Sequence, residues 1–125
     1  MRVLILSLIV LSAALAPALA APATIEGSWR GSGTVSHRGS ADAVRCRARF
    51  TKAGGASFGV SSQCATETGR YDVSGRVTRS GDNRYSGQVQ TNGQGGAVVI
   101  VQHGNRLSVT VTSRRGSGRL SLSRN

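Results

Sequence analysis

A chain of 125 residues is long enough for one small domain and too short for two well-packed ones. Its 16 basic residues outnumber 5 acidic ones, giving a net charge of +11. The five acids are scattered, and the two histidines, His37 and His103, fall in or beside expected turns. This inventory offers neither clustered metal ligands nor a pair of positioned catalytic groups. We therefore expect no enzymatic activity, no catalytic residue, no metal site and no cofactor.

The N-terminal residues 1–20 have the pattern of a cleavable signal peptide. Arg2 gives a positive start, Val3 to Leu15 carries no charge, and Ala18-Leu19-Ala20 places small side chains before the expected cut. The uncharged stretch is too short for a membrane helix, which needs about 20 apolar residues. We expect cleavage after Ala20 and a periplasmic or secreted mature chain, residues 21–125, without a membrane span and with a net charge of +10.

From Gly27 onward, apolar and polar residues alternate with a period of two, which is typical of half-buried β-strands. The clearest segments are 44–50 and 58–64, and the glycine-containing turn 52–56 joins them into a hairpin. Placing Cys46 opposite Cys64 keeps both segments' apolar residues on one face, and an export route favours pairing them as a disulfide. Closing a loop of about 19 residues stabilises a fold by about 3 kcal/mol. The same register pairs Ala48 with Ser62 and Phe50 with Val60.

Six further strands are expected around residues 27–36, 70–78, 84–91, 97–102, 107–111 and 120–122, separated by short glycine and asparagine turns. Segment 97–102 is apolar on both faces, so we expect a strand that is covered on both sides or pressed against another surface. Eight sequential strands with short links predict an all-β, eight-stranded antiparallel up-and-down barrel, with a β-sandwich as the alternative. Glycines within the strands suit the tight bending of a small barrel; they are Gly31, Gly33, Gly75 and Gly87.

The inner face of this barrel has few large side chains. Its aromatic residues are Trp29 and four candidate ligand-facing residues, Phe50, Phe58, Tyr71 and Tyr85. The rest is mostly valine, alanine, serine and glycine, so the interior is either tightly collapsed or holds a small cavity. The short mature chain favours collapse.

Gly27-Ser28-Trp29 opens the first strand, and Arg119 or Arg124 lies on the last. This combination resembles the calycin superfamily of lipocalin, fatty-acid-binding and avidin barrels. The resemblance implies that an arginine packs over the indole and closes the barrel, a cation–π contact worth about 0.5 to 2 kcal/mol. We take Gly27, Trp29 and Arg119 as this barrel-closing motif.

The Gly-x-Trp near the mature N-terminus and one early disulfide also resemble the periplasmic alkaline metalloprotease inhibitors, which are small eight-stranded barrels. That resemblance implies that a segment ahead of the barrel, here residues 21–26, enters a protease cleft.

Arg45, Arg47 and Arg49 project from the outer face of one strand and form a candidate anion-binding face, with a merely solvated surface as the alternative. Nucleic acid is not expected as a partner, because the aromatic residues needed for base stacking fall on the inner face. We expect a monomeric, exported, non-enzymatic barrel that binds a small ligand or an anionic cell-envelope component. The alternative function is inhibition of a periplasmic protease.

Overall fold

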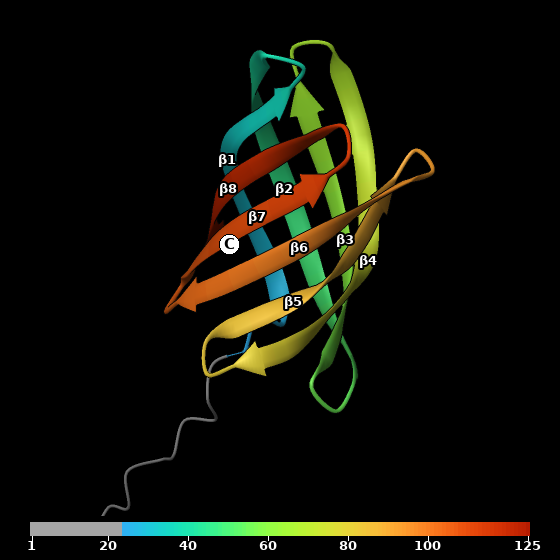
Figure 1. The fold of residues 1–125 in the computed structure, drawn as a ribbon. Coiled ribbons are helices and arrows are strands. Elements are labelled where there is room, and N and C mark those ends of the chain that lie inside the picture. Colours follow the sequence, from blue (N-terminus) through green and yellow to red (C-terminus); the bar gives the residue numbers. More distant parts are fainter. Residues whose placement is uncertain (1–23) are drawn as a thin grey trace, which may run out of the picture.

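A computed structural model describes residues 24–125 of the chain as one closed barrel (Figure 1). The expected signal peptide, residues 1–20, lies outside the described residues. Within the described part, no helix is long and apolar enough to cross a membrane. The strands are β1 (Gly27–His37), β2 (Ser40–Gly54), β3 (Ser57–Thr66), β4 (Gly69–Gly81), β5 (Arg84–Thr91), β6 (Gln94–His103), β7 (Arg106–Ser113) and β8 (Gly116–Arg124).

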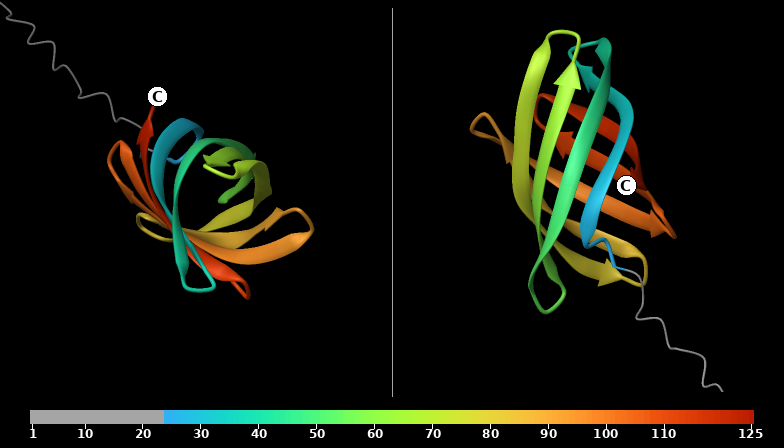
Figure 2. Two further views of the ribbon diagram at one scale, coloured as in Figure 1. Left: turned by 90° about the horizontal axis from the view of Figure 1, so that it is seen from above. Right: turned by 180° about the vertical axis from the view of Figure 1, so that it is seen from behind.

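Each strand pairs antiparallel with the next, and β8 pairs with β1 to complete the ring, which Figure 2 shows from above and from behind. The predicted eight-stranded antiparallel barrel is confirmed, and the β-sandwich alternative is wrong. The closed ring has no free strand edge, and it is formed wholly by Gly27–Arg124. Removing residues 1–20 therefore leaves every strand in place.

The predicted β2–β3 register is also confirmed. Cys46 lies opposite Cys64 and forms a disulfide with it. In β2, buried Val44, Cys46, Ala48 and Phe50 alternate with exposed arginines. Alternating burial and cysteine spacing thus fix the same pairing, because a slip by one residue would place the apolar set in water.

The turns are shorter than the sequence predicts. Asn92 and Gly93 have φ values of 48° and 77°, and positive φ at both central residues is the geometry of a tight two-residue hairpin. Strand β6 consequently begins at Gln94 rather than Ala97. The expectation that β6 is covered on both faces is wrong, since Val99 and Val101 on its outer face remain partly exposed.

Strands β1 and β8 approach so closely at Gly31 that no larger residue fits there. A Cβ atom on Gly31 would lie 1.8 Å from the carbonyl oxygen of Ser121. The same close approach occurs at the other three glycines that the sequence marks for tight bending, Gly33, Gly75 and Gly87. These glycines let the sheet curve enough to close.

Gly31→Ala should destabilise the barrel by more than about 2 kcal/mol, because the backbone of β1 or β8 must move to relieve the clash. Gly59→Ala is the matched control, since its Cβ would meet nothing closer than 3.8 Å, and we expect a change within about 1 kcal/mol. Urea unfolding of both variants measures the difference. Equal free energies of unfolding would contradict the close-approach argument.

One end of the barrel is closed by Trp29 and by the segment that precedes β1. The indole is 0% exposed, and its Nε1 donates a hydrogen bond of 2.8 Å to the carbonyl oxygen of Ile25. Arg124 lies over the indole, with its Cζ 4.2 Å from the ring centroid. Its Nη1 and Nη2 donate to the carbonyl oxygens of Glu26 and Thr24, both at 2.8 Å.

Arg124 therefore takes the place that the sequence analysis assigned to Arg119. Arg119 is exposed on the outside of β8, where it pairs with Thr34 and Thr110, far along the strand from Trp29. The β1–β8 register explains the difference, because it places Trp29 opposite Arg124. Gly27 completes the motif: its φ is 121°, and a Cβ there would lie 3.1 Å from Nη1 of Arg124.

Arg124→Ala should lower the free energy of unfolding by about 2–4 kcal/mol, through loss of the cation–π contact and two charge-assisted hydrogen bonds. Arg119→Ala removes the same charge from an exposed position, and we expect a change within about 0.5 kcal/mol. Denaturant unfolding of the two variants separates them. A similar loss in both would mean that net charge, rather than the closing contact, is responsible.

Candidate functional site

The half of the barrel away from Trp29 is hollow. A cavity of about 640 Å³ occupies it, within the size range of small-molecule sites. The expectation of a tightly collapsed interior is therefore wrong. The short side chains of the inner face are the cause, because they cannot meet across the ring. Apolar lining residues come from all parts of the wall and include Ala48, Val60, Val73, Val98, Val111 and Leu120.

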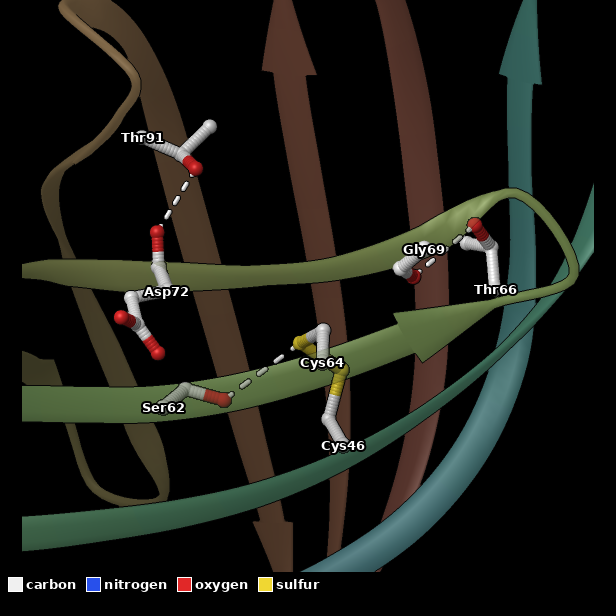
Figure 3. Close-up of a disulfide and its surroundings, with 7 residues drawn as sticks. All are labelled: Cys46, Ser62, Cys64, Thr66, Gly69, Asp72 and Thr91. Atoms are coloured by element: carbon white, nitrogen blue, oxygen red, sulfur yellow. Dashed lines mark hydrogen bonds between the residues drawn. A yellow bond between two sulfur atoms is a disulfide. The ribbon is translucent and has the colours of Figure 1, made fainter.

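The disulfide forms part of the cavity wall. Cys46 and Cys64 are 5% and 6% exposed, and both line the cavity. Figure 3 shows the bridge between β2 and β3, with the hydroxyl of Ser62 3.5 Å from Sγ of Cys64. The bridge thus joins two adjacent strands at the depth of the cavity.

The hydrogen bonds drawn in Figure 3 tie the strand ends beside the bridge. Thr91 donates to the carbonyl oxygen of Asp72 at 2.6 Å, which links β5 to β4. Thr66 donates to the carbonyl oxygen of Gly69 across the β3–β4 turn at 3.4 Å. These two contacts add side-chain hydrogen bonds to the β4–β5 pair and to the β3–β4 turn.

Polar and charged residues surround the mouth of the cavity at the open end. The guanidinium-bearing Arg70 and Arg115 line it, together with one carboxylate, Asp42, and with His37. All four side chains are exposed. Two permanent positive charges against one negative charge make the rim attractive to an anionic group.

The four candidate ligand-facing aromatic residues divide between the two halves of the barrel. Phe50 and Tyr71 line the cavity. Phe58 and Tyr85 do not: they pack edge to face with ring centroids 5.6 Å apart in the filled half, beside a separate pocket of about 170 Å³. Alternation predicts which face a residue takes but not its depth along the barrel axis, so those two assignments are wrong.

Tyr71 is the cavity's aromatic residue with a hydroxyl group. Burial raises the pKa of this hydroxyl above its usual value of 10.0. It therefore stays protonated in neutral solution and is able to donate a hydrogen bond to a ligand.

Arg45, Arg47 and Arg49 are exposed on the outer face of β2, as the alternation predicts. The register adds Arg30 to them, because it lies directly opposite Arg47 on the neighbouring strand β1. Sequence reasoning missed Arg30. Extending the β1–β2 pairing from the hairpin turn at Arg38 and Gly39 is the signal that finds it.

No three histidine, cysteine, aspartate or glutamate residues between 24 and 125 gather as a potential metal site. His37 and His103 are exposed at opposite ends of the barrel, in β1 and β6. The feature with the best-defined geometry in the described chain is the cavity and its charged mouth.

No family model and no curated protein matches the sequence. Solved structures of small β-barrels do match. A redesigned β-barrel has a TM-score of 0.66 and 13% identity, covering 80% of this chain and 90% of that one. Another, mFAP1, bound to DFHBI, has a TM-score of 0.67 and 11% identity, covering 80% and 94%. A de novo designed fluorescence-activating β-barrel has a TM-score of 0.64 and 12% identity, and the match covers 80% of this chain and 93% of that one.

At these low identities the likeness shows the fold alone. It supports a small closed β-barrel and confirms neither the calycin superfamily nor the protease inhibitor family.

Replacing both cysteines by valine should lower the free energy of unfolding by about 3 kcal/mol, because the unfolded chain then regains the entropy of the closed loop. Valine keeps apolar bulk at the cavity wall, so the change isolates the covalent link. Urea unfolding of the oxidised chain and the Cys46→Val/Cys64→Val variant gives the value. The free energy of unfolding of the variant without reductant should equal that of the parent chain in reductant. A difference between these two values would show that valine itself perturbs the cavity wall.

Proposed function

We propose that this chain is an exported, non-enzymatic binding protein that holds a small amphipathic ligand inside its barrel. The observation that carries the proposal is the 640 Å³ cavity, mostly apolar inside, with its mouth at the end of the barrel away from Trp29. Moving an apolar body of matching size from water into this space is favourable by about 25 cal/mol per Å² of apolar surface buried. One of the similar barrels is named as bound to a small molecule, DFHBI, which supports the same use of the fold.

The polar part of the ligand lies at the mouth. Arg70 and Arg115 outnumber Asp42 there, so an anionic head such as a carboxylate or sulfonate is favoured over a cationic one. Deeper in, the hydroxyl groups of Tyr71 and Ser62 offer hydrogen bonds to a second polar atom. We infer a ligand with an apolar body and one anionic end.

Export rests on the signal-peptide pattern of residues 1–20 and is supported by the disulfide, which forms and persists in oxidising compartments. The alternative role as a protease inhibitor gains no support from the geometry. It needs residues 21–26 free to enter a cleft, whereas Arg124 and Gln102 donate hydrogen bonds to Thr24, and Ile25 is 0% exposed.

Ala48→Phe should weaken ligand binding strongly, because the new ring projects from the inner face of β2 into the cavity. Ala43→Phe is the matched control, since Ala43 lies on the same strand but is exposed on the outer face. Fluorescence titration with anilinonaphthalene sulfonate, an anionic apolar dye, measures the affinity of each variant. We expect at least a tenfold loss for Ala48→Phe and little change for Ala43→Phe.

The charge of the ligand is tested with Arg70→Ser/Arg115→Ser. This variant should have a lower affinity for the anionic dye and an unchanged affinity for the neutral dye Nile red. For the cavity test, thermal unfolding curves first verify that the Ala48→Phe and parent proteins are both folded. Equal dye affinity of these two folded proteins would then refute binding inside the barrel.

A further inference from the structure

The outer wall of β1 and β2 carries a compact group of arginines, which we call the arginine face: Arg30, Arg45, Arg47 and Arg49. All are exposed. The three on β2 are two residues apart, a spacing of about 6.6 Å along a strand, and Arg30 is directly opposite the middle one. The face is therefore a short row of guanidinium groups with one more beside its centre.

The residues paired with the arginines of the face on β1 and β3, other than Arg30 and Arg47 themselves, are uncharged. On β1, Ser28 and Ser32 lie opposite the two outer arginines. On β3, the three opposing residues are Ser61, Gln63 and Ala65. On the strands, the outward carboxylate Asp72 on β4 lies one strand further away, opposite Gln63. Ahead of β1, exposed Glu26 stands two residues before Ser28, at the edge of the face beside Arg49. No carboxylate is paired directly with any of the four arginines, and their longer side chains stand above their neighbours.

This arrangement lowers the stability of the free barrel. Like charges directly opposite each other across two strands are destabilising, and Arg30 and Arg47 are such a pair. An anionic surface placed over the face removes the repulsion and supplies oxygen acceptors for the forked guanidinium donors. The charge pattern is therefore one that an anionic partner stabilises.

We propose that the arginine face binds the phosphate headgroups of an anionic membrane surface. A bilayer presents phosphates over a broad area and so fits a wall of separate guanidinium groups. Nucleic acid is disfavoured because the aromatic rings of the described chain lie on the inner side of the barrel, where they cannot stack on bases. The face carries no apolar side chain to insert, so binding is peripheral and weakens with salt.

Attachment through this face is compatible with the cavity. None of its four arginines lines the cavity or its mouth. The barrel is therefore able to lie on a membrane by its β1–β2 wall while the open end stays accessible. This proposal does not depend on the ligand-binding function, and either can fail alone.

The test is sedimentation of the chain from Ala21 onward with vesicles of phosphatidylglycerol and phosphatidylcholine, at low and high sodium chloride. The quadruple variant Arg30→Ser/Arg45→Ser/Arg47→Ser/Arg49→Ser should bind at least a hundredfold more weakly, since each basic residue near such a surface contributes about fivefold. Pure phosphatidylcholine vesicles should bind neither protein. If the quadruple variant fails to fold, the single variant Arg47→Ser replaces it in the test, with an expected loss of vesicle affinity of about fivefold.

The matched control removes the same charge elsewhere, in Arg76→Ser/Arg84→Ser/Arg106→Ser/Arg114→Ser, all exposed positions off the arginine face. It should retain most of the vesicle binding. Equal losses in the two quadruple variants would overturn the proposal in favour of net charge alone. A second arm measures binding to a single-stranded oligonucleotide, and tighter binding there, lost in the arginine-face variant, would overturn the membrane as the partner.

Discussion

The structure depends on how bulk is distributed along the axis of an eight-stranded ring. Eight strands enclose a space that side chains can just fill if enough of them are large. Here the large ones, among them Trp29, Phe58, Tyr85 and Leu107, gather in one half and are almost fully buried. The other half is lined mainly by valine, glycine, serine and threonine with the disulfide, so it closes around empty space. A filled floor and a hollow upper half follow from this single asymmetry.

The filled half is held by a contact between the two ends of the described chain. Arg124, next to last in the sequence, covers Trp29 and takes two carbonyl oxygens of the segment before β1. Asn125 donates a further backbone hydrogen bond to Ser28. These contacts have a sequence separation of about 100 residues, so they form only once the ring is complete. They stabilise closure itself, and the cavity exists because the ring is closed at this end and open at the other.

Much of this architecture could be predicted from the sequence, because the period of two and the cysteine spacing are local signals. They fix the eight strands, the Cys46–Cys64 pairing and the outward direction of the β2 arginines. What failed depends on the register between strands distant in sequence. The β1–β8 pairing is needed to predict that Arg124, and not Arg119, packs on Trp29. The depth of a residue along the barrel axis is needed to predict that Phe50 lines the cavity and Phe58 does not. The sequence offers no local measure of either quantity.

Strand β2 shows how the two proposed binding surfaces remain separate although they share a backbone. Its inward residues Cys46 and Ala48 line the cavity, and the residue between them, Arg47, belongs to the outer wall. A shift by one residue would exchange the two sets, placing guanidinium groups in the interior. The disulfide opposes that shift because it pins Cys46 to Cys64, and the apolar cost of exposing Phe50 opposes it as well. One covalent link therefore fixes which residues meet a ligand inside the barrel and which meet a partner outside it.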